Sequence, residues 1–90
     1  MNNKHRKILE AIFARPVRPG IKWADIEGLL IGLGAEVEEA QGSRITVSLN
    51  GVDAVFHRPH PQPTTDKGAL MSVRRFLVNA GVMDDESAKV

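Results

Sequence analysis

Two histidines in the second half of the chain, His57 and His60, are the residues best suited to proton transfer. The pKa of an imidazole ordinarily lies near ~6.5, so histidine can take up or release a proton at neutral pH. His57 ends a segment of alternating residues, and His60 stands between two prolines on a stiff, extended stretch. Each is a candidate catalytic acid or base; the alternative is that both are ordinary exposed histidines.

Basic side chains are concentrated in two parts of the sequence. Residues 1–22 hold six Lys or Arg and one Glu, residues 42–83 hold five basic and two acidic residues, and residues 23–41 hold five acidic residues and no basic one. This distribution favours a polyanionic partner, because Lys and Arg neutralise phosphate; ordinary solvated surfaces are the alternative. The candidate phosphate ligands in the second basic part are Arg44, Arg58, Lys67, Arg74 and Arg75.

A β-hairpin is predicted over residues 44–57. Apolar and polar residues alternate on both sides of Asn50-Gly51, a dipeptide that favours a two-residue type I′ turn. This register pairs apolar residues on one face, which we expect to meet the core. On the other face it pairs Arg44 with His57, so that a cation and a titratable imidazole lie side by side.

Helices are predicted around this hairpin. Apolar residues at helical spacing indicate helices over 4–15, 23–33 and about 67–80, and residues 35–40 read as a short strand. Three prolines keep 58–65 extended. We therefore predict an α+β fold with a three-stranded antiparallel sheet packed against helices, in the order α-β-β-β-α, with an additional N-terminal helix.

Length and composition restrict the remaining possibilities. The 90 residues form a single domain over 1–90 with a small core, and we expect 83–90 to be a flexible tail. The chain has no cysteine, and its histidines and acidic residues show no zinc-site spacing, so we expect no metal and no cofactor. No apolar run is long enough to span a membrane, which leads us to expect a cytoplasmic protein.

Several short motifs occur in order along residues 22–82. The first is Lys22-Trp23-Ala24-Asp25-Ile26 with the exit Leu33-Gly34-Ala35; it is followed by Gly42-Ser43 before the second strand, Pro59-His60-Pro61 after the third, and Gly68-Ala69-Leu70 to Ala80-Gly81-Val82 at the closing helix. Together they resemble the HicA family, the small toxins of bacterial toxin–antitoxin pairs, which have a fold like a double-stranded-RNA-binding domain. The residues 4–15 precede this HicA-like core.

The resemblance implies that the protein cleaves messenger RNA and is neutralised by a HicB-like antitoxin. Family members carry their catalytic histidine directly after the Gly-Ser step, where this chain has Arg44. An arginine stays protonated at neutral pH and cannot act as that base. We therefore expect His57 and His60 to be catalytic, if the protein is an endoribonuclease, and we expect the RNA to contact Ser43, Arg44, Arg58, Lys67, Arg74 and Arg75.

Two other interpretations stay open. In one, the protein is a non-catalytic RNA-binding or protein-interaction module that kept the fold but lost the catalytic histidine. In the other, the N-terminal helix mediates self-association into a homodimer. That helix can equally cover a sheet edge or a core surface.

Overall fold

The computed structural model describes residues 1–59 and 63–83. Its elements in chain order are α1 (Asn3–Ile12), α2 (Trp23–Gly32), β1 (Glu36–Glu39), β2 (Arg44–Leu49), β3 (Val52–His57) and α3 (Lys67–Asn79). The three strands form an antiparallel sheet in the order β1-β2-β3. The predicted α+β fold is thus confirmed.

The β2–β3 hairpin has the predicted register. Arg44 pairs with His57, Ile45 with Phe56, and Leu49 with Val52 at the turn. Asn50 and Gly51 adopt φ angles of 51° and 81°, the two positive values that a type I′ turn requires. The turn is also fixed to α3, because Asn50 Nδ2 donates a 2.8 Å hydrogen bond to the carbonyl of Ala80.

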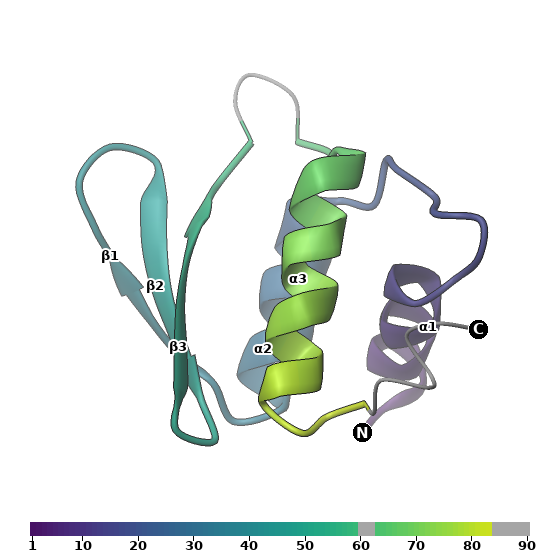
Figure 1. The fold of residues 1–90 in the computed structure, drawn as a ribbon, viewed down its shortest axis with the longest axis horizontal. Helices are drawn as coiled ribbons and strands as arrows, with labels where there is room; N and C mark the ends of the chain where they lie inside the picture. Colours follow the sequence, from purple (N-terminus) through teal and green to yellow (C-terminus); the bar gives the residue numbers. More distant parts are fainter. Residues whose placement is uncertain (60–62, 84–90) are drawn as a thin grey trace.

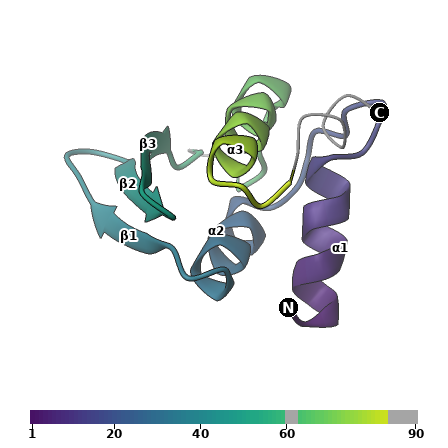
Figure 2. The same cartoon turned by 60° about the horizontal axis from the view of Figure 1, so that its bottom comes forward.

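The elements form three layers. In Figure 1 the sheet lies on the left, α2 and α3 pack side by side on its right face, and α1 lies beyond them; Figure 2 shows the same order from another direction. Inward residues of all three layers form the buried core, including Ile12, Leu30, Val47, Phe56 and Leu77. The other face of the sheet has no described segment on it.

The N-terminal helix packs on the helical layer and covers no sheet edge. It was predicted over 4–15 but ends at Ile12, because a residue that precedes proline disfavours the helical conformation and Pro16 follows closely. Ile12 and Phe13 are 1% and 7% exposed, so this helix contributes to the core. None of the described helices combines the length and the apolar character that crossing a bilayer requires.

A buried arginine fastens the end of α1 to α3. Arg74 Nε donates to the carbonyl of Ile12 at 2.6 Å, and Nη2 donates to the carbonyl of Ala14. Its guanidinium also lies 5.8 Å from the centre of the Phe13 ring. The prediction of Arg74 as an RNA ligand therefore needs correction: its side chain is only 3% exposed and its donors serve helix-end carbonyls.

Candidate nucleic-acid interface

Arg44 and His57 lie next to each other at the open end of the β2–β3 hairpin. Both side chains are exposed, and both are on the sheet face away from the helices. The next pair along the two strands, Ser43 and Arg58, is hydrogen-bonded, because the Arg58 N–H donates to the Ser43 carbonyl at 2.8 Å. Arg44 and His57 are therefore a non-hydrogen-bonded pair, in which the Cα atoms approach to about 4.5 Å.

The guanidinium of Arg44 is available to a ligand. Its Nε makes one long contact of 3.4 Å with the Gln41 carbonyl, and within the described part of the chain Arg44 forms no ion pair. A planar guanidinium with free N–H groups can bind a phosphate through two parallel hydrogen bonds. Ser43, the residue before it, is exposed in the loop that leads into β2.

A small cavity of about 180 Å³ lies beside His57. It is bounded by Trp23 and by the entry to α3, where Asp66 caps the helix by accepting from the Ala69 N–H at 2.8 Å. Thr65 also lines it; this residue is 2% exposed, and its hydroxyl has no hydrogen-bond partner among the described residues. The cavity thus offers a free hydroxyl, and His57 is among the residues that line it.

The two sides of this cavity are held by main-chain hydrogen bonds. Residues 63–65 run along the segment before α2: Trp23 N–H donates to the Pro63 carbonyl at 2.9 Å, and Thr65 N–H donates to the Ile21 carbonyl at 2.8 Å. Lys67, the first residue of α3, is exposed next to Asp66. His60, the second predicted catalytic residue, lies outside the described residues.

Arg58 is engaged by carboxylates and is not a free cation. Its Nε lies 2.7 Å from Glu27 Oε1 and its Nη1 lies 2.6 Å from Glu39 Oε1, while Trp23 Nε1 also donates to Glu27 at 2.6 Å. The Arg58 hydrogen bond lowers the pKa of Glu39, and the two carboxylates raise the pKa of Arg58. This cluster fixes the strand end that carries His57, and we leave Arg58 out of the phosphate ligands.

Glu27 is the residue of this cluster that sequence reasoning missed. Its position one helical turn after Trp23 is visible in the sequence, because residues four apart share a helix face. Its pairing with Arg58 joins residues 31 positions apart, and no local pattern predicts such a contact.

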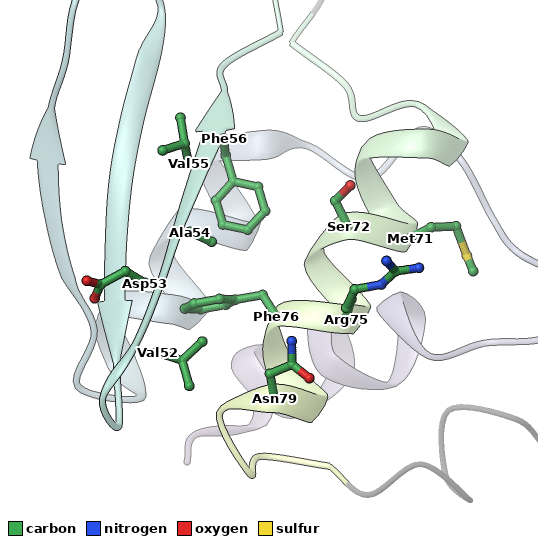
Figure 3. A pocket seen from close by; sticks show the side chains of 10 residues that line it. All are labelled: Val52, Asp53, Ala54, Val55, Phe56, Met71, Ser72, Arg75, Phe76 and Asn79. Carbon is green, nitrogen blue, oxygen red and sulfur yellow. The ribbon is translucent and has the colours of Figure 1, made fainter.

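The two adjacent arginines of α3 have opposite surroundings. Arg74 is buried against α1, whereas Arg75 is exposed and lines a cavity of about 280 Å³ between α3 and β3 (Figure 3). Arg75 forms no hydrogen bond or ion pair with the described residues, so its charge is free. The predicted ligand Arg44 and the predicted catalytic residue His57 are therefore adjacent, while Arg75 belongs to a different surface.

Acidic residues share the open sheet face with Arg44 and His57. Glu36 pairs with Ser48 and Glu38 with Thr46 on β2, and Asp53 pairs with Ser48 from the other side. Paired residues point to the same face, so the three carboxylates lie along the far part of that face. On this face, the end with Arg44 is the part that electrostatically suits a polyanion. Within the described ranges, no group of three or more His, Asp or Glu residues is arranged to hold a metal ion.

Comparisons with known proteins agree with this architecture. The family model described as the HicA toxin of bacterial toxin–antitoxin systems matches residues 23–82, from the start of α2 to just after α3. No curated protein and no solved structure matches the chain. The matched range covers two thirds of the sequence and contains every strand, leaving α1 outside it. The chain therefore belongs to the HicA family of bacterial toxins.

Proposed function

We propose that this toxin binds messenger RNA and cleaves it, with Arg44 holding the phosphate and His57 transferring the proton. The observation that carries the proposal is the pairing of these two exposed side chains across β2 and β3. An arginine supplies a permanent positive charge, and a histidine supplies a group that titrates near neutral pH. Two neighbouring residues then divide the tasks of phosphate binding and proton transfer.

The proposed reaction uses the RNA's own 2′-hydroxyl as nucleophile. His57 in its neutral form accepts the proton of that hydroxyl, and the 2′-oxygen attacks the adjacent phosphorus. The bond from phosphorus to the 5′-oxygen breaks, giving a 2′,3′-cyclic phosphate and a 5′-hydroxyl end. His60 or water supplies the proton for the leaving oxygen, and Arg44 stabilises the extra negative charge of the pentacoordinate phosphorane.

The protein partner that we propose is a HicB-like antitoxin, acting in the cytoplasm where mRNA is translated. Membership in a toxin family implies an antitoxin as the kind of partner. Arg44 and His57 are both exposed, so an antitoxin that covers this end of the hairpin would neutralise the toxin.

Cleavage of a labelled mRNA in the presence of a metal chelator tests the proposal. We expect His57→Ala to lower the cleavage rate by about 100-fold or more, the usual contribution of a proton-transferring side chain. Arg44→Ala should weaken RNA binding. It should also make the slope of log K against log salt concentration shallower by about 0.7, the value for one phosphate contact on a single strand. Arg6→Ala, an exposed arginine on α1, is the control and should change neither.

A second candidate function is RNA binding without cleavage. The observation that favours it is Arg44 itself, which stands where the resemblance implies the catalytic histidine. In that case the wild-type protein binds the RNA with an Arg44-dependent affinity, but no cyclic phosphate end appears and His57→Ala has no effect. Detection of the cyclic phosphate end by primer extension and mass spectrometry separates the two functions.

A further inference from the structure

β3 is an edge strand with an unpaired side. It pairs only with β2 in the described sheet, and Figure 1 shows no segment along its other side. The N–H of Arg58 points toward the β2 side, where it donates to Ser43, and the direction of the N–H and C=O groups alternates from residue to residue along a strand. The N–H and C=O groups of Asp53, Val55 and His57 therefore point outward from the sheet, where another strand could pair with them.

This edge has few of the features that normally prevent strand addition, and Asp53 is its one acidic side chain. Edge strands are commonly protected by lysine, proline, a bulge or short length, whereas β3 runs for six residues without any of these. Val55, at its centre, is 59% exposed. An exposed β-branched residue in the middle of a regular edge strand suits pairing with a second strand.

A groove beside the same edge is also uncovered. Phe56 and Phe76, which both line it, are buried and pack edge to face with ring centroids 5.6 Å apart, whereas Met71, which also lines it, is 43% exposed (Figure 3). In the figure, Asp53 and Val55 point away from α3, so they lie on the other face of the strand. A strand added to β3 would cover apolar surface on both faces.

The residues of β3 are complementary to a second copy of β3. In an antiparallel pair centred on Val55, Val55 meets its own counterpart, and Asp53 meets the partner's His57 on the same face. An imidazole N–H donates a hydrogen bond to a carboxylate in either protonation state, and the charged imidazole adds attraction. Asp53, Val55 and His57 then each have a cross-strand partner in the second copy.

Other two-fold registers are less favourable. Centring the pair on Asp53 places two carboxylates opposite each other, and like charges directly opposite are destabilising. Centring it on His57 brings Pro59, which has no N–H to donate, opposite Val55. We propose that a second copy of this chain pairs antiparallel with β3, centred on Val55, and joins the two sheets into one six-stranded sheet.

The dimer would complete the candidate site. A row of side chains would run across three strands, from Arg44 to His57 to the partner's Asp53. The carboxylate would accept a hydrogen bond from the imidazole and so fix the orientation of its ring. This consequence rests on the proposed function, whereas the dimer itself does not.

The mass of the protein in solution tests the pairing directly. Sedimentation equilibrium up to millimolar chain concentration should give twice the 9.8 kDa of one chain. Val55→Lys should weaken the dimer at least tenfold, because two ammonium groups would then face each other at the centre. Thr46→Lys, on the same sheet face but in the central strand β2, is the matched control and should leave the dimer intact.

A charge-exchange experiment identifies the register. Asp53→Arg alone places a cation opposite the partner's His57, and His57→Glu alone places a carboxylate opposite the partner's Asp53. Each variant should be monomeric by itself. An equimolar mixture should form a heterodimer, because one cross-strand pair is then an arginine with a glutamate and the other is the original pair of His57 with Asp53. Recovery of the dimer on mixing also shows that each variant is folded.

Three outcomes would overturn the inference: a monomeric wild type at all concentrations, a dimer that Val55→Lys leaves unchanged, or a mixture that stays monomeric. If the wild type is monomeric and Val55→Lys instead abolishes antitoxin binding, the edge serves the antitoxin. The two proposals fail separately. A dimer that leaves RNA intact contradicts only the proposed cleavage, and cleavage by a monomer contradicts only the proposed dimer.

Discussion

Arg44 and His57 differ in what they can do with a phosphodiester. Arg44 binds and stabilises charge in every step, but it gives up no proton at neutral pH. His57 can exchange protons but holds phosphate less firmly. Placing both on one exposed strand pair keeps the two properties within reach of one phosphate. In the proposed reaction, Arg44 therefore contributes mainly to affinity and His57 mainly to rate.

The carboxylates around Arg58 make a prediction about stability in acid. The hydrogen bond from Arg58 lowers the pKa of Glu39 below its ordinary value of 4.5, so the folded state favours the ionised carboxylate. That contribution is fully present above about pH 4.5 and is lost as the pH falls through the lowered pKa. The urea midpoint of the wild type should exceed that of Glu39→Gln at pH 6, and the two should converge toward pH 3.

The neighbouring residue Glu38 provides the control. It lies on the opposite sheet face and forms no ion pair with the described residues. Glu38→Gln should therefore track the wild type across this pH range. A Glu39→Gln curve parallel to the wild type at every pH would show that the Arg58 contact contributes nothing to stability, as is common for exposed ion pairs.

At the scale of elements, local patterns determined what could be predicted. Strict alternation over residues 44–49, with Asn50-Gly51 as the turn, predicted every pair of the hairpin correctly, including Arg44 with His57. The same reasoning could not place Arg74, because its burial depends on α1, whose last residue, Ile12, is 62 positions away in the sequence. A signal was nevertheless present. Arg74 lies four residues after Leu70 and three before Leu77, on the apolar stripe of α3.

Arg74 also leads to a prediction about how α1 is attached. Its two hydrogen bonds satisfy carbonyls at the end of α1, and burial lowers the pKa of its guanidinium, with the charge of Arg15 adding to this effect. Arg74→Met should lower the free energy of unfolding by about 1.5–3 kcal/mol, the range for hydrogen bonds to a charged group. Urea denaturation measures this value.

The adjacent exposed arginine is a matched control for this experiment. Arg75→Met should change stability by no more than about 0.5 kcal/mol, as surface substitutions usually do. Arg74→Lys should fall between the wild type and Arg74→Met, since an ammonium keeps the charge but lacks the guanidinium fork that reaches two carbonyls. Equal losses for Arg74→Met and Arg75→Met would contradict the assigned role.

At the scale of the whole molecule, the charge distribution limits where the proposed RNA ligand could lie. The net charge is only +1, so binding depends on where basic and acidic groups are placed. The acidic residues Glu36 and Glu38 share the open sheet face with Arg44. RNA bound at Arg44 should therefore leave the sheet toward the α3 entry at Lys67 and avoid the far part of the strands.

This arrangement predicts that removing an acidic charge from the open face strengthens RNA binding. Glu38→Gln should raise the affinity for a short single-stranded RNA by about two- to threefold at low salt. At low salt, the repulsion between the Glu38 carboxylate and nearby RNA phosphates is only partly screened. Glu10→Gln, an exposed change on α1 at the other side of the helical layer, should have no such effect. Fluorescence anisotropy at low and high salt measures both. The gain should disappear at high salt, where the screening length is only about 3 Å, and equal gains for both variants would mean that RNA responds to net charge alone.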